Sequence, residues 1–127
     1  ICGGDNSSCS SIDFDACSMP INHLHMIEGS VFYNVNFDIG GFQFDIDGTT
    51  VSGYSGGDAL INGFTISVGG NTVLGFSFTG SVIPEGCGLL TELTLADSNA
   101  AEGLSEIIFS VGSSGTESLT LEYYTGP

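Results

Sequence analysis

The sequence predicts an all-β sandwich of eight to nine strands, of the jelly-roll or immunoglobulin-like kind. Two observations predict it: apolar and polar residues alternate within short segments, and glycine-rich turns separate those segments. The 127 residues suit a single domain, and 41% of them are hydrophobic, enough to fill a core. The 20 glycines suit many short strands joined by tight turns.

The alternation places the strands in order along the chain. The clearest signal is Phe42, Phe44 and Ile46, which alternate with polar side chains. In the segment 89–95 we expect every second residue from Leu89 to Leu95 to share one face. The expected strands are 21–27, 31–37, 42–47, a short one from Val51, 64–68, 73–78, 89–95, 107–111 and 119–124.

Turns and loops follow from the residues between these strands. Gly40-Gly41 predicts a break before the third strand, and Gly69-Gly70-Asn71 predicts a β-hairpin. Residues 53–58 predict a Gly- and Ser-rich loop, and residues 96–103 predict one helical turn. No helix of ordinary length is expected.

Residues 1–20 form a Cys-, Ser- and Asp-rich arm in front of the sandwich domain of residues 21–127. The cysteines are Cys2, Cys9, Cys17 and Cys87, and they allow three full pairings. In an acidic, glycine-rich chain we favour disulfides, with Cys2–Cys9 closing a small loop and Cys17–Cys87 tying the arm to the sandwich. A zinc site and a pair between subunits are the alternatives, although the C-x6-C-x7-C spacing does not match the usual zinc patterns.

The charge balance excludes whole classes of partner. The chain has 15 Asp and Glu and no Lys or Arg, so its formal net charge is −15. Proteins contact nucleic-acid phosphates largely through Lys and Arg, so we expect no nucleic-acid partner. The same negative field repels anionic membranes, and the apolar runs of the sequence are far too short to insert into one.

Carboxylates two residues apart are the candidate metal ligands. Asp13 with Asp15, and Asp45 with Asp47, would each share a face of an extended segment. Ca²⁺ prefers such oxygen ligands and would relieve clustered negative charge. We therefore expect no required cofactor, and these carboxylates are the candidates for a structural Ca²⁺ site. The alternative is a solvated acidic face.

The sequence does not indicate an enzyme. The segment 53–57 reads GYSGG, which is not the G-x-S-x-G turn of serine hydrolases. His23 and His25 would share a strand face, where ordinary surface histidines are the simplest interpretation. The Asp pairs more often face solvent or bind Ca²⁺ than hydrolyse glycosides.

One stretch of the chain resembles a known family. Residues 41–48 read GFQFDIDG, which is similar to a strand of cohesin-like modules that leads into a loop. Residues 73–78 (VLGFSF), 83–90 (IPEGCGLL) and 93–95 (LTL) extend the similarity over roughly residues 29–124. The resemblance implies a nine-stranded jelly-roll sandwich and a role in extracellular protein–protein attachment. The Cys-rich arm is not part of that pattern.

The expected function is therefore structural: an extracellular or cell-surface protein that binds other proteins, either as a self-assembling subunit of a filament or surface layer or as a cohesin-like attachment module. The start at Ile1 predicts a processed or excised product, and Asn6 begins a glycosylation sequon. Self-assembly by strand exchange would use the arm or the segment 119–124. The alternative is a calcium-stabilised carbohydrate-binding module, in which Tyr54 is the best candidate to stack on a polysaccharide.

Overall fold

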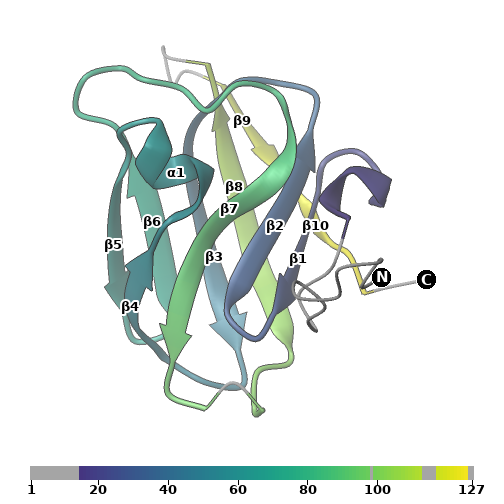
Figure 1. Cartoon of the computed structure of the whole chain (residues 1–127), viewed down its shortest axis with the longest axis vertical. Helices are drawn as coiled ribbons and strands as arrows, with labels where there is room; N and C mark the ends of the chain where they lie inside the picture. Colours follow the sequence, from purple (N-terminus) through teal and green to yellow (C-terminus); the bar gives the residue numbers. More distant parts are fainter. Residues whose placement is uncertain (1–14, 98, 113–116, 126–127) are drawn as a thin grey trace, which may run out of the picture.

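A computed structural model describes residues 15–97, 99–112 and 117–125. It confirms the predicted all-β sandwich: two five-stranded sheets face each other (Figure 1). The elements are η1 (Ala16–Ser18), β1 (His23–Ile27), β2 (Ser30–Val35), β3 (Ile39–Asp47), β4 (Val51–Ser55), α1 (Gly57–Ile61), β5 (Thr65–Gly69), β6 (Thr72–Phe76), β7 (Gly86–Leu95), β8 (Gly103–Val111), β9 (Glu117–Thr120) and β10 (Glu122–Tyr123).

The two sheets have the strand orders β10-β1-β2-β7-β4 and β5-β6-β3-β8-β9. All neighbouring strands are antiparallel except β1 and β10, which are parallel. The edge strands β4 and β5 contact each other on one side of the sandwich. β9 and β10 therefore close the opposite side (Figure 1).

The segment expected as one last strand, 119–124, is divided between the two sheets. β9 pairs with β8, and β10 pairs with β1 in the other sheet. Leu121 lies between them, is buried, and donates its N–H to the carbonyl of Ile107. This crossing accounts for a larger number of strands than expected, and it means that the segment is paired within its own domain.

The core lies between the sheets and contains the inward-facing residues of both. Phe42 is at its centre, because its ring packs against the rings of Phe44, Phe64 and Phe109 at centroid distances of 5.7 to 6.1 Å. Such offset or tilted aromatic contacts add to the free energy gained by burying the rings. The alternation of Phe42, Phe44 and Ile46 into the core is as the sequence predicts.

Two local predictions are wrong. Gly40-Gly41 does not break the chain, because β3 runs through both glycines from residue 39. The register with β8 shifts there, and a Cβ atom on Gly40 would overlap the carbonyl oxygen of Gly112, so glycine permits a close approach of two backbones. The segment 53–58 is likewise not a loop throughout, because β4 runs to Ser55 and α1 begins at Gly57. In the described part of 96–103, the Ala100 N–H donates to the Asp97 carbonyl and closes a single turn.

No helix among the described residues is both long and apolar enough to cross a membrane.

Candidate functional site: an uncovered apolar sheet face

The outer faces of the two sheets differ in how they are covered. On the β2 sheet, Phe32 points outward and is buried under Ala16 and Met19 of the arm. The amide of Asn34 donates a hydrogen bond to the carbonyl of Met19, at 2.8 Å. Residues 15–20 thus pack over the part of this outer face that contains Phe32.

A disulfide bonds this segment to the sheet. Cys17, in η1, is bonded to Cys87, in β7, with their Cα atoms 5.2 Å apart. The carboxylate of Asp15 caps η1 by accepting the N–H of Cys17. The expected Cys17–Cys87 pair is therefore confirmed, whereas Cys2 and Cys9 lie outside the described residues.

The opposite outer face, on β6, β3 and β8, carries apolar side chains that the described residues leave open. Gln43 is paired with Leu74 on one side and with Ile108 on the other, so these three side chains form a row. Leu74 is 39% exposed and Ile108 is 42% exposed. We call this surface the β3 face, and it comprises Gly41, Gln43, Leu74, Phe76, Ile108 and Ser110.

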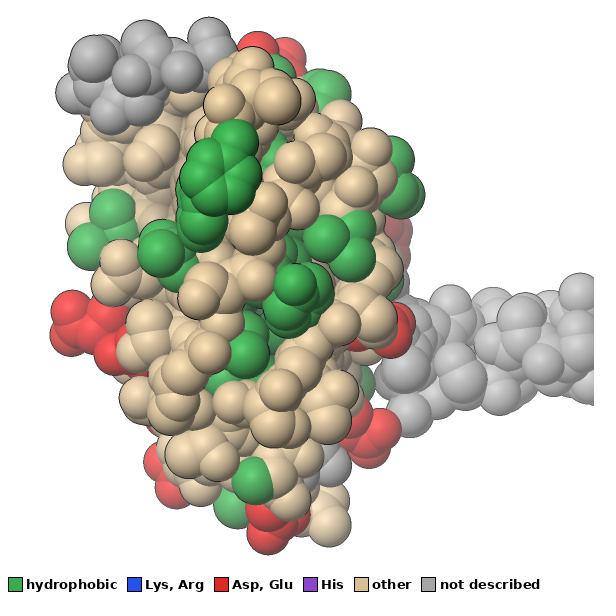
Figure 2. Space-filling view, turned by 90° about the vertical axis from the view of Figure 1, so that its left-hand side faces the viewer, with side chains coloured by type: hydrophobic (Ala, Val, Ile, Leu, Met, Phe, Trp, Pro, Cys, Tyr) green, Lys and Arg blue, Asp and Glu red, His purple; other side chains and the backbone are tan. Residues whose placement is uncertain are grey.

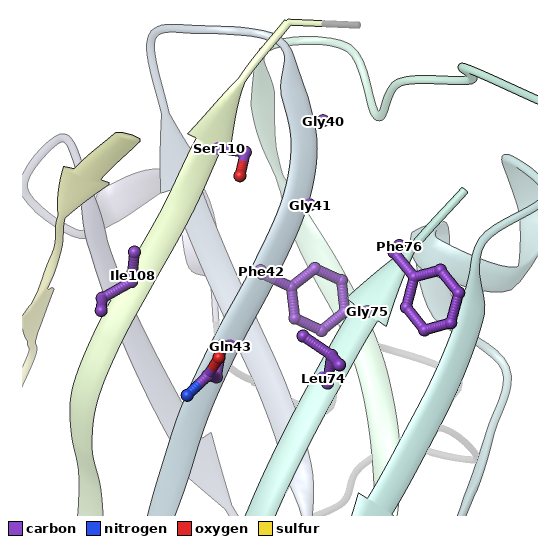
Figure 3. A pocket seen from close by; sticks show the side chains of 9 residues that line it. All are labelled: Gly40, Gly41, Phe42, Gln43, Leu74, Gly75, Phe76, Ile108 and Ser110. Carbon is purple, nitrogen blue, oxygen red and sulfur yellow. The ribbon is translucent and has the colours of Figure 1, made fainter. Parts of the chain in front are cut away.

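The next row of the β3 face contains a hollow. Gly41 is paired with Phe76 and with Ser110, and it has no side chain to fill the space between them. The hollow has a volume of about 220 Å³, and its walls are Phe76 and Leu74 on β6 and Ile108 and Ser110 on β8 (Figure 3). The Gln43 side chain projects from the central strand at its edge (Figure 3).

The apolar surface continues beyond β6. The ring of Phe76 meets the ring of Phe78 edge to face at 5.0 Å, and Phe78 is 81% exposed. An aromatic pair with one exposed ring, next to two half-exposed aliphatic side chains, is the kind of patch that marks an interaction site. The lining offers apolar contact and the amide and hydroxyl groups of Gln43 and Ser110 for hydrogen bonds.

A β-bulge produces the apolar part of β8. Residues 106 and 107 together lie opposite the single residue 44 of β3, and Glu106 has a φ of 53°. Ile107 is buried and Ile108 faces outward, so two adjacent isoleucines serve opposite faces. The sequence signal for the β3 face is this pair, together with Val73-Leu74: in each, an outward apolar residue follows a core residue.

The predicted metal ligands that lie among the described residues accept hydrogen bonds from other groups of the protein. Asp45 accepts a hydrogen bond from the Thr72 hydroxyl at 2.9 Å, and Asp47 accepts one from Ser105 at 2.8 Å. Within residues 15–97, 99–112 and 117–125, no three His, Cys, Asp or Glu side chains gather into a metal-binding group. Asp13 lies outside these residues, and calcium binding stays a prediction.

The remaining candidates lie away from the hollow. Tyr54 is exposed on the edge strand β4. The Nδ1 atoms of His23 and His25 donate to the backbone carbonyls of Ile21 and Tyr124, at 2.9 and 2.7 Å, and the second bond ties β1 to the segment after β10. Asn6 lies outside the described residues.

A hydrogen bond between a buried tyrosine and a partly buried carboxylate joins α1 to the core. The hydroxyl of Tyr33, in the core, donates to Asp58 of α1 at 2.6 Å. Burial raises the pKa of Tyr33, and the hydrogen bond and negative charge of Asp58 raise it further. This contact holds α1 against the sandwich.

Comparisons of the chain with protein families, with curated proteins and with solved structures give no match.

Proposed function

We propose that the chain is a non-enzymatic extracellular protein that works by contact with other proteins, in the first place with copies of itself. The observation that carries the proposal is the asymmetry of the sandwich. Residues 16–19 cover Phe32 on the outer face of one sheet and a disulfide holds them there, while the β3 face carries apolar side chains that the described residues leave exposed.

The chemistry of the β3 face supports binding. Its hollow is lined by Gly, Phe, Leu and Ile with one amide and one hydroxyl, which suit contact rather than proton transfer. Apolar and aromatic groups with a few polar ones are the usual content of the centre of a protein interface. The burial of these apolar side chains against another protein would therefore release their hydration water and favour binding.

The disulfide supports an extracellular setting, and the net charge determines the conditions under which copies would assemble. Disulfides persist in oxidising environments, and Cys17–Cys87 fits that setting. A net charge of −15 keeps dispersed copies soluble and apart at low salt, so assembly would be favoured by salt that screens the repulsion. The resemblance to cohesin-like modules points the same way, towards extracellular attachment by a β-sandwich.

Electron microscopy of negatively stained protein tests the proposal. The protein is concentrated in steps in buffers of low and high NaCl, and each sample is imaged without denaturation. We expect regular fibres, sheets or discrete oligomers that grow with concentration and salt. Single particles of monomer size under every condition would contradict self-assembly.

A further inference from the structure

The four edge strands differ in charge. β9 and β10 carry Glu117 and Glu122, whereas β4 and β5 carry no charged residue. α1 connects these two uncharged strands, and its one carboxylate, Asp58, accepts the hydrogen bond from Tyr33. In a chain of net charge −15, β4 and β5 are therefore the two edge strands at which a second copy would meet the least charge repulsion.

This side is also apolar. Figure 2 shows hydrophobic side chains down the middle of the side on which β5 and α1 lie, with carboxylates towards its margins. Ile61 of α1 is 78% exposed, and its neighbour Leu60 is also exposed. A second molecule that approached here would cover apolar surface without burying an unpaired charge.

Among the described residues, no strand is paired with the outer edge of β5, which lies beside β4 of the other sheet. β5 ends its sheet, and it pairs with β6 over five residues without a register shift, so it is a regular strand. Antiparallel pairing directs the N–H and C=O groups of every second residue of an edge strand away from its neighbour. Proteins usually protect such edges with charges, proline or bulges, and β5 has none of these, whereas β4 has a register shift between Val51 and Gly53.

We propose that β5 pairs with β5 of a second copy of this chain, antiparallel about a two-fold axis through Ser67. Thr65 then lies opposite Gly69, and Ile66 lies opposite Val68, of the other copy. Ile66 is buried and Val68 is half-buried, so the core rows of the two sheets meet, while the exposed Thr65 and Ser67 meet on the outer face. The two five-stranded sheets become one continuous sheet.

A copy of the same chain fits this edge better than a different partner does. A basic protein would be drawn to carboxylates, which β5 lacks. The strand is instead self-complementary, because residues of like burial face each other across the proposed axis. A two-fold contact closes on itself, so it makes a dimer; larger assemblies need a second contact, such as the β3 face. The inference thus rests on the proposed function and supplies one of its contacts.

Cysteine cross-linking of two single variants tests the register. In Ser67→Cys the two thiols lie directly opposite each other across the axis, at Cβ–Cβ distances of about 5 Å. In Thr65→Cys they are four residues apart along the strands, or about 13 Å, although the side chain is equally outward. Each variant is oxidised briefly with a copper–phenanthroline catalyst and air, in which oxygen takes two electrons and two protons from each thiol pair, and is run on a non-reducing gel beside the unsubstituted protein.

We expect most of the Ser67→Cys protein to run as a covalent dimer, with Thr65→Cys at the level of the unsubstituted protein. Equal cross-linking of both variants, or none in either, would overturn the pairing. As a second readout, Ser67→Glu places two carboxylates on the axis and should weaken dimerisation by about tenfold or more in sedimentation equilibrium. Ser18→Glu, at an exposed position of η1 on the other sheet, adds the same charge and should leave it within about twofold.

The two proposals fail in different ways. If electron microscopy shows regular assemblies but Ser67→Cys gives no selective cross-link, the β5 pairing is wrong and the proposed function stands. If the protein remains monomeric by microscopy and sedimentation at every concentration and salt, both the pairing and the self-assembly are wrong.

Discussion

The ring of Phe42 occupies the space into which a side chain at Gly75 would project. The two residues are paired across β3 and β6, and a Cβ atom on Gly75 would overlap three atoms of the ring. The absence of a side chain in β6 therefore lets Phe42 lie flat over its neighbour and stack with Phe44 and Phe64.

Gly75→Ala should destabilise the protein, because the methyl group forces the Phe42 ring out of a packed aromatic cluster. We expect a loss of about 1–3 kcal/mol in the free energy of unfolding, measured by urea denaturation. Gly69→Ala is the matched control: it lies in the same hairpin, has open space at its Cβ position, and should be neutral or slightly stabilising. Equal losses in the two variants would contradict the role of Phe42.

Removal of the Cys17–Cys87 disulfide should expose Phe32, which η1 and Met19 cover, and should lower the free energy of unfolding. The bond spans a sequence separation of 70 residues, for which the chain-entropy model gives about 4 kcal/mol. The double variant Cys17→Ser/Cys87→Ser should therefore unfold at lower urea and bind more of a hydrophobic dye under native conditions. Unchanged dye binding would show that η1 holds its place without the disulfide.

The Tyr33–Asp58 contact predicts a loss of stability in alkali. The pKa of Tyr33 is raised in the folded protein, so above about pH 10 the unfolded chain releases the Tyr33 proton while the folded chain keeps it. Stability from this residue is thus complete below pH 10 and falls as pH rises, by at most about 1.4 kcal/mol for each pH unit.

The substitution Tyr33→Phe removes the contribution of this residue to the pH dependence of stability. At neutral pH the variant should lose about 1–2 kcal/mol, because a hydrogen bond to a carboxylate is broken. Between pH 9 and pH 11 its stability should fall less steeply than that of the unsubstituted protein in urea titrations. Identical slopes would mean that another group controls the alkaline loss.

The sequence predicts the sandwich well because the alternation of its strands is set by the core. Prediction from the sequence fails where a local irregularity of the backbone determines which face a side chain takes. The apolar face expected from Leu89 to Leu95 is divided by a register shift between β2 and β7, so that Leu89 packs beside Phe32 under the arm while Leu93 packs in the core. Periodicity alone cannot place such a bulge.

The β3 face was missed for a related reason. Gln43 lies on the polar side of the clearest strand, and nothing in the sequence pairs it with Leu74 and Ile108. Strand order and register are set by contacts between residues distant in the chain. The Cys17–Cys87 pair was predictable only as one of several pairings, since cysteine count does not determine connectivity.

The central claim is that the β3 face binds protein, and sedimentation velocity of two charge variants tests it most directly. Ile108→Asp places a carboxylate on the β3 face, and Ile21→Asp places one at an isoleucine that is similarly exposed, at 48%, on another part of the surface. Urea denaturation first verifies that both variants are folded. We predict that Ile108→Asp reduces the population of species larger than a dimer, whereas Ile21→Asp leaves the distribution as in the unsubstituted protein. Assembly that is unaffected by Ile108→Asp, or equally affected by both substitutions, would contradict the account.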